Sequence, residues 1–282
     1  MTYSLLLILV VVVAGLFVWL RNRKKEKDVA PLPPTYAQLM AEHVPYYASL
    51  PDEKKALFAE RVQQFLAHVT IEGVDTTVDD VDRVLVASSA VIPIFAFDGW
   101  HYPNLTTVLL YPTTFNESFE IEGNDRTALG MVGEGGGLQS TMILSKPALR
   151  AGFANETSKE NTAIHEFVHL LDKVDGAIDG TPDYLVPKEN IQSWIRLIHR
   201  KMEEIRANRS DIDPYGLTSE AEFFAVVSEY FFKRPDLLQT KHPELFTELE
   251  AIFQQNPLTP DKEPEADKEE PESATNDEKK DV

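Results

Sequence analysis

Hydrophobic residues recur through the middle of this chain at the three- and four-residue spacing of amphipathic helices. In residues 51–70, Phe58, Val62, Phe65 and Val69 fall on one helical face between charged positions. The same reasoning predicts further helices at residues 79–97, 156–171, 186–207, 218–232 and 243–255. Short runs rich in apolar and β-branched residues predict strands at 106–111 and 138–144. Because helices dominate and the strands do not alternate regularly with them, the pattern predicts an α+β domain, mainly helical with a small sheet.

The first residues form an uncharged apolar run, residues 4–20, which reaches the short end of the range for a helix that crosses a bilayer. The basic residues follow this run rather than precede it: Arg21, Arg23, Lys24, Lys25 and Lys27. By the positive-inside rule, this asymmetry predicts one N-terminal transmembrane helix with its N-terminus outside the cell and the remaining chain in the cytoplasm. We therefore expect a single-pass protein of the cell inner membrane.

Composition changes sharply along the chain and suggests four segments. Residues 1–20 would be the transmembrane anchor, and residues 21–35 a basic and then proline-rich linker. Residues 36–257 would form the folded domain, since roughly 220 residues suffice for one core. Residues 258–282 carry Pro, Asp, Glu and Lys with almost nothing apolar, so we expect a disordered acidic tail.

The overall composition excludes several classes of function. The chain contains no cysteine, so disulfides, thiol catalysis and cysteine-bound metals are excluded. Its net charge of −19 makes nucleic acid an improbable partner, because so acidic a chain repels phosphate backbones. The glycine-dense run 130–137 lacks the Gly-Lys-Ser/Thr of a phosphate-binding loop, and Glu134 would repel a phosphate. We predict a turn between strands there.

The motif His165-Glu-Phe-Val-His169 carries the clearest chemistry in the sequence. On a helix, two histidines four residues apart share a face and can bind one cation. Glu166 follows the first of them, where it can take a proton from a metal-bound water and pass it to a leaving amine. The neighbouring residues are mostly uncharged or apolar, which strengthens electrostatic contacts at such a site.

A catalytic zinc requires a third protein ligand and one open position. Spacing leaves several candidates open. Asp175 stands six residues after the second histidine, and Asp183 ends a Gly-Thr-Pro-Asp run. Glu222 and Glu229 lie on one face of an apolar predicted helix, and on spacing alone they are equally good candidates, ahead of Asp175. Ser219-x-x-Glu222 also fits a capping box, in which Glu222 would only close the helix start.

Three stretches together resemble the Mlc titration factor A family of bacterial zinc-dependent peptidases: HEFVHLLD, DPYGLTSEAEFFAVVSEYFFKRP and VASSAVIPIFAF…YPNLTTVLLYP. The resemblance covers about residues 36–257. It implies a gluzincin-type, zincin-like metallopeptidase domain similar to the catalytic domain of anthrax lethal factor. It also implies a Zn²⁺ ion bound by two histidines and a glutamate.

The resemblance assigns roles to individual residues. His165, His169 and Glu222 match the metal ligands, and Glu166 matches the catalytic base. Tyr215 matches a tyrosine that leans over the metal, where its hydroxyl could donate to the developing oxyanion. Glu229 then becomes the partner that orients one histidine ring. Asp172 would do the same or close the end of its helix.

We therefore expect a membrane-anchored zinc peptidase that hydrolyses peptide bonds with a metal-activated water and a Glu general base. The strand at 138–144 would pair with an extended substrate backbone. The alternative is a non-catalytic regulatory module that uses the same fold to hold a transcription regulator or another partner at the membrane. The family is linked both to small peptide substrates and to a glucose-responsive transcriptional repressor, but its better-known members are soluble. The resemblance therefore implies a peptide or protein substrate, with a transcriptional regulator as a second partner.

Overall fold

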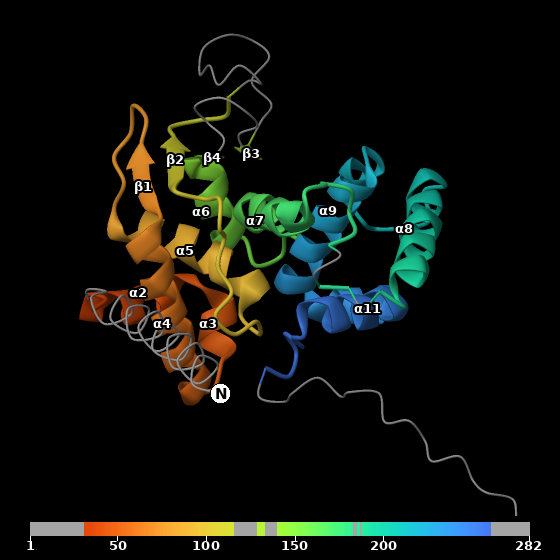
Figure 1. The fold of residues 1–282 in the computed structure, drawn as a ribbon, viewed down its shortest axis with the longest axis horizontal. Coiled ribbons are helices and arrows are strands. Elements are labelled where there is room, and N and C mark those ends of the chain that lie inside the picture. The colour runs from red at the N-terminus through yellow and green to blue at the C-terminus, as the bar shows by residue number, and fades with distance from the viewer. Residues whose placement is uncertain (1–30, 116–128, 133–139, 183–184, 187, 261–282) are drawn as a thin grey trace, which may run out of the picture.

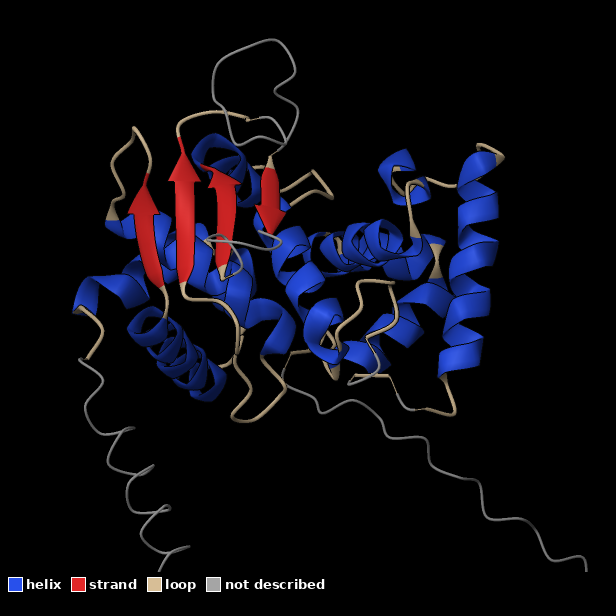
Figure 2. Cartoon of the chain, turned by 45° about the horizontal axis from the view of Figure 1, so that its top comes forward, coloured by secondary structure: helices blue, strands red, loops and turns tan. Residues whose placement is uncertain are grey.

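A small mixed sheet forms one side of the molecule, with helices packed against it (Figures 1 and 2). The computed structural model describes residues 31–115, 129–132, 140–182, 185–186 and 188–260. The strands are β1 (Thr70–Gly73), β2 (Thr107–Tyr111), β3 (Gly130–Val132) and β4 (Thr141–Ser145), in the order β1-β2-β4-β3. The first three strands of that order are parallel, whereas β3 runs antiparallel to β4.

The sheet register places apolar residues at the same level across the strands. Ile71 pairs with Val108, Val108 with Met142, and Met131 of β3 with Ile143. β4 is paired on both sides, so the expectation that residues 138–144 bind a substrate backbone is wrong for this strand. The strand at that edge of the sheet is β3.

Helices precede, connect and follow the strands. They are α2 (Pro34–His43), α3 (Pro45–Ser49), α4 (Asp52–His68), α5 (Asp80–Ile94), α6 (Lys146–Ala154), α7 (Thr162–Asp172), α8 (Ile191–Arg206), α9 (Glu220–Lys233), α10 (Pro235–Lys241) and α11 (Pro243–Phe253). Two short 3₁₀ helices, η2 (Lys173–Asp175) and η3 (Pro214–Leu217), follow α7 and precede α9. The predicted α+β class, mainly helical with a small sheet, is confirmed.

Helix α7 joins the two sides of the molecule. It lies between the sheet with α5 and α6 on one side and α8, α9 and α11 on the other (Figure 1). Its Phe167 is fully buried, and the ring contacts Tyr102 and Phe65 at centroid distances of 5.0 and 5.7 Å. On the far side, Phe231 of α9 stacks on Phe253 of α11 at 5.8 Å. Burial of these aromatic rings stabilises the packing on both sides of α7.

Several elements differ from the sequence-based expectations. The helix expected at 156–171 begins only at Thr162, because Asn161 caps it: its Oδ1 accepts a hydrogen bond from the Ile164 amide at 3.1 Å. The helix expected from residue 186 begins at Ile191. The glycine-dense run starts as strand β3, and its residues 133–137 lie outside the described part of the chain.

The predicted placement as a single-pass inner-membrane protein is contradicted. Among the described residues, no helix has both the length and the apolar character required to cross a membrane. Such a helix requires about 20 predominantly apolar residues, whereas the longest described helix, α4, has 17 residues and contains charged residues at positions 52–55, 60 and 61. The apolar segment at residues 4–20 and the acidic tail at 261–282 lie outside the described residues.

Asp82 offers a test of what fixes α5 beneath the sheet. Its fully buried carboxylate closes a capping box with Asp79 and forms ion pairs with Arg150 at 2.8 Å and Lys146 at 2.9 Å. We expect Asp82→Ala to lower the free energy of unfolding by about 2–3 kcal/mol, because it removes the buried carboxylate that pairs with Lys146 and Arg150 and breaks one of the two hydrogen bonds of the capping box. Urea unfolding measures this change.

The matched control removes a carboxylate from an exposed pair. Glu203 pairs with Arg206 on the surface of α8. Glu203→Gln should leave the urea midpoint nearly unchanged, since exposed ion pairs contribute little. Equal effects of the two substitutions would contradict the structural role of Asp82.

Candidate metal centre

The helical spacing of α7 brings two imidazoles together. His165 and His169 lie one turn apart, and their Nε2 atoms are 3.1 Å from each other. The side chains are 10% and 13% exposed, respectively. Asn161 starts the helix one turn earlier, so the cap also fixes where the histidines point.

Helix α9 brings a carboxylate to the same point. Oε2 of Glu222 lies 2.9 Å from Nε2 of His165 and 3.5 Å from Nε2 of His169. Ser219 caps α9 and accepts a hydrogen bond from the Glu222 amide at 3.1 Å. The cap therefore uses the backbone of Glu222, while its carboxylate faces the histidines. Among the described residues, these three side chains form a group whose ligand atoms lie within 4.8 Å of one another.

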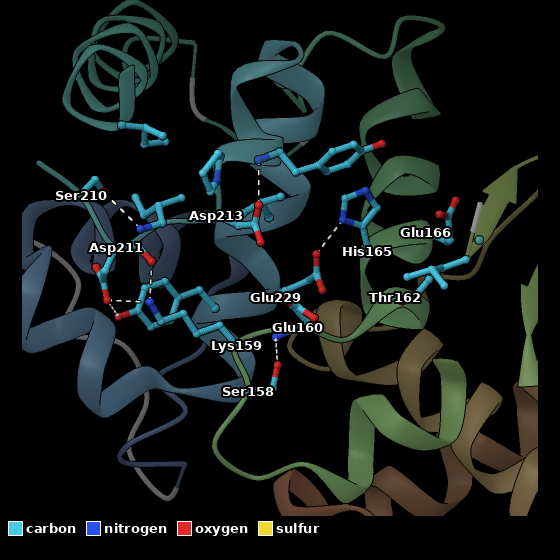
Figure 3. Close-up of a pocket in the computed structure, with 18 of the residues that line it drawn as sticks. Ser158, Lys159, Glu160, Thr162, His165, Glu166, Ser210, Asp211, Asp213 and Glu229 are labelled. Atoms are coloured by element: carbon cyan, nitrogen blue, oxygen red, sulfur yellow. Dashed lines mark hydrogen bonds and ion pairs between the residues drawn. The ribbon is translucent and has the colours of Figure 1, made fainter. Parts of the chain in front are cut away.

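Glu229 determines which nitrogen of His165 faces this group. Its Oε1 lies 2.7 Å from Nδ1 of His165, and its other oxygen accepts a hydrogen bond from the Asn161 amide. When the carboxylate accepts a hydrogen bond from Nδ1–H of a neutral ring, Nε2 presents its lone pair to Glu222 and His169. Figure 3 shows this contact between Glu229 and His165.

Three acceptors that face one another fit a bound cation. Tetrahedral zinc with bonds of about 2.0–2.1 Å separates its ligand atoms by about 3.3 Å, and the three separations here are 2.9, 3.1 and 3.5 Å. Two imidazoles and one carboxylate are also a donor set of catalytic zinc sites. The residues present therefore fit a zinc ion, with His165, His169 and Glu222 as its ligands.

The pKa values of His165 and Glu222 also indicate that this group of side chains favours a bound positive charge. Burial alone would lower the pKa of His165, but the carboxylates of Glu229 and Glu222 raise it to about 10. Burial would raise the pKa of Glu222, but hydrogen bonds from the two histidines hold it well below its usual range. Without a metal, a proton would have to fill this position.

Glu166 lies beside the group in a different environment. It is 7% exposed, and burial raises its pKa although the nearby histidines oppose that shift. Gly130 of β3 lies so close that a Cβ atom there would come within 2.6 Å of Oε1 of Glu166. The edge strand and the carboxylate of Glu166 are thus in direct contact across the site (Figure 3).

Tyr215 lies at the open side of the group. Its ring centroid is 6.0 Å from that of His165, and the residue is 54% exposed. The 3₁₀ helix η3 holds it, with Asp213 accepting a hydrogen bond from the Tyr215 amide at 2.8 Å. Partial burial, followed by the negative charges of Glu222 and Glu166, raises the pKa of Tyr215. Its hydroxyl therefore keeps its proton and can donate it in a hydrogen bond.

Asp172, which the sequence analysis considered as a partner of a histidine or as a helix end, contacts the loop before α8. The fully buried Asp172 accepts a hydrogen bond from the Gly180 amide at 2.7 Å, and Trp194 donates to the Gly180 carbonyl at 2.8 Å. Gly180 has φ +77°, and a Cβ atom there would overlap the carbonyl of Glu220. Asp172 thus holds a loop against the first turn of α9.

The structure does not place the side chains of the two remaining candidates. Asp175 belongs to η2, but its side chain lies outside the described part of the structure. Asp183 lies outside the described residues.

A cavity of about 980 Å³ opens beside His165 and Glu166. Its walls are strand β3, the loop at 157–162 and the segment at 208–215, together with residues of α8 and α9. Sequence reasoning missed Gly130, Lys159 and Asp211 in this cavity. The glycine-dense run was a signal for the first, because such runs mark close backbone approach.

Comparison with known proteins places this chain in a family. The model of the family described as glucose-regulated metallo-peptidase M90 matches residues 18–254. An uncharacterised protein of Synechocystis is 28% identical over 253 residues, which cover 85% of this chain and 90% of the relative. Proteins named Mlc titration factor A from Pectobacterium atrosepticum and Escherichia fergusonii are 28% and 30% identical, each over 76% of this chain and 84% of the relative.

Zinc affinity tests the contact that orients His165. We expect Glu229→Gln to weaken zinc binding about 10- to 100-fold, because the amide no longer favours the tautomer whose Nε2 faces the ligand group. Competition with a chromophoric chelator measures the affinity. Glu220→Gln is the control, since Glu220 lies on the same helix but pairs with exposed His199 at 3.2 Å. Equal affinity of the Glu229 variant and the parent would contradict the role of this contact.

Proposed function

This chain belongs to the glucose-regulated metallo-peptidase M90 family, and we propose that it is a zinc-dependent peptidase. One observation carries the proposal: three acceptor atoms converge at zinc-like separations directly beside a buried glutamate. His165, His169 and Glu222 would hold the ion. When bound, zinc supplies a Lewis acid that polarises the scissile carbonyl and lowers the pKa of its water to about 7.

Glu166 is the general base in this proposal. Its carboxylate takes a proton from the attacking water and transfers it to the nitrogen of the leaving amine. Burial raises its pKa from the usual range of a glutamate, which brings the group closer to the operating pH of a proton shuttle. Gly130 leaves room for the carboxylate against β3, where any side chain would collide with it.

Tyr215 and the edge strand would bind the peptide. The hydroxyl of Tyr215 donates a hydrogen bond to the carbonyl oxygen as negative charge develops on it. Among the described strands, β3 is paired with β4 alone, so an extended peptide could add to its other side. This edge starts at Gly130, beside Glu166. A peptide paired with it would therefore place its scissile bond near the proposed site of proton transfer.

The relatives' names favour a second candidate function. They are named as titration factors of Mlc, which suggests that this chain also binds a transcriptional regulator. Binding of this kind does not require Glu166, whereas the proposed hydrolysis does. The presence of Glu166 beside a complete ligand set favours catalysis as the primary function.

Glu166→Gln separates the two functions. We expect the variant to bind zinc with the affinity of the parent and to lose at least about 10²–10⁴-fold in kcat for peptide hydrolysis, because the amide cannot accept the proton. Zinc content by elemental analysis and hydrolysis of a fluorogenic peptide library measure both properties. Full activity in this variant, or no zinc in the parent, would refute the proposed mechanism.

Gly130→Ala tests the contact between β3 and the base. The added methyl would push the Glu166 carboxylate aside, so we expect kcat to fall about 100-fold with zinc affinity and thermal stability nearly unchanged. The stability should persist because the clash is with side-chain atoms of Glu166, which can rotate away, and not with the backbone. Unchanged kcat would mean that Glu166 does not act from the position described.

A further inference from the structure

Asp211 collects hydrogen bonds from three separate parts of the chain. Its Oδ2 accepts from Lys159 at 2.6 Å and from Tyr230 and Lys241 at 2.9 Å each, and its Oδ1 lies 2.8 Å from Nε2 of His242. Lys159 lies in the loop before α7, Tyr230 on α9, and the last two at the end of α10. Lys159 also donates to the backbone carbonyl of Asp211.

These bonds outweigh the cost of burying the carboxylate. Burial would raise the pKa of Asp211, but the four donors hold it well below its usual range. Three of the donors are themselves largely buried, and Lys159 additionally lies over the Tyr230 ring at 4.6 Å. A carboxylate that accepts hydrogen bonds from two lysines, a tyrosine and a histidine is fixed in position.

The cluster around Asp211 is attached to the same two elements that orient His165. Lys159 precedes Asn161 by two residues, and the Asn161 amide donates to Glu229. Tyr230 follows Glu229 directly on α9. The loop before α7 and helix α9 therefore contact each other twice, once through Glu229 and once through Asp211.

Asp211 adds a third element to that junction: the segment at 208–217. In this segment, Ile212 is 2% exposed, and Asp213 accepts from the amide of Tyr215. Asp211 and Tyr215 both line the cavity beside His165 (Figure 3). Tyr215 itself is more than half exposed, and its ring contacts His165 at a centroid distance of 6.0 Å. Because so exposed a ring is only partly held by packing, the backbone that carries Tyr215 contributes to its position.

We propose that Asp211 is a positioning residue that ties segment 208–217 to the loop before α7 and to α9, and thereby holds Tyr215 over the metal centre. The proposal rests on the proposed peptidase function for its kinetic consequences. Its structural part, that Asp211 fixes the segment, stands independently of catalysis.

A kinetic double-mutant cycle on the full chain tests the link to Tyr215. We expect Asp211→Asn to lower kcat about tenfold or more, with KM changed less than about twofold. The reason is that the displaced hydroxyl of Tyr215 would no longer stabilise the transition state, whereas it contributes little to substrate binding. In the Tyr215→Phe background, the same substitution should lower kcat by less than about twofold. An equal loss in both backgrounds overturns the proposal, because it would show that Asp211 acts through stability or another group.

Amide hydrogen exchange of the metal-free protein provides a readout without catalysis. Peptides from residues 208–217 should exchange faster in Asp211→Asn than in the parent, with exchange in α5 unchanged. Glu244→Gln is the matched control, since it removes a carboxylate from the exposed pair with Arg200. Unchanged exchange of the segment in Asp211→Asn overturns the proposal.

Two further outcomes remain interpretable. If Asp211→Asn does not fold, Lys241→Met is used instead, since it removes one of the four donors to Asp211 and Lys241 is half-exposed. This variant should give the same changes in kcat and in the exchange of segment 208–217, with smaller amplitude. If it gives neither change, the proposal fails. If the parent hydrolyses no peptide, the proposed peptidase function fails, and the exchange of segment 208–217 alone decides the positioning role.

Discussion

The site depends on one contact: the packing of α7 against α9, which brings two imidazoles and a carboxylate together. Nε2 of a neutral His165 ring and Oε2 of Glu222 are both acceptors and lie 2.9 Å apart, so either a proton or a metal cation has to lie between them. The apolar surfaces of the two helices supply the free energy that holds these acceptors together. Phe167 packs α7 against its sheet side, and Phe224 and Phe231 pack α9 against α11.

The same helix pair explains why residues distant from the metal are buried and polar. Asp172 at the end of α7 holds Gly180 against the first turn of α9, which carries Glu222. Glu229, two turns later on α9, holds the start of α7 at Asn161 and His165. The two helices are therefore joined by polar contacts at both ends of their crossing. Such a frame fixes ligand positions before any metal binds, which lowers the cost of binding.

Sequence alone was sufficient for the parts of the site that local geometry determines. His165, Glu166 and His169 follow from helical spacing, but spacing could not separate Glu222 from Glu229, because both face the same way along α9, and only the family resemblance assigned Glu222 as the ligand. The structure separates them by tertiary contact: one faces Nε2 of His165 and the other Nδ1 of the same ring. Asp211 and strand β3 escaped prediction for the same reason, since their partners lie far away in sequence. Hydrophobic periodicity alone was sufficient to predict the α+β class. The membrane placement inferred from residues 4–20 is not supported.

Environment divides the glutamates of this site into different roles. Hydrogen bonds from two histidines lower the pKa of Glu222, whereas burial raises that of Glu166, one helix away. Carboxyl groups with pKa values moved apart in this way are suited to different roles, which in the proposed function are those of a metal ligand and a proton carrier. A structural zinc site would use four protein ligands in a closed shell. Among the described residues, three ligand groups converge beside a cavity lined by Glu166 and the exposed Tyr215, which fits the open position that the proposed catalytic site requires.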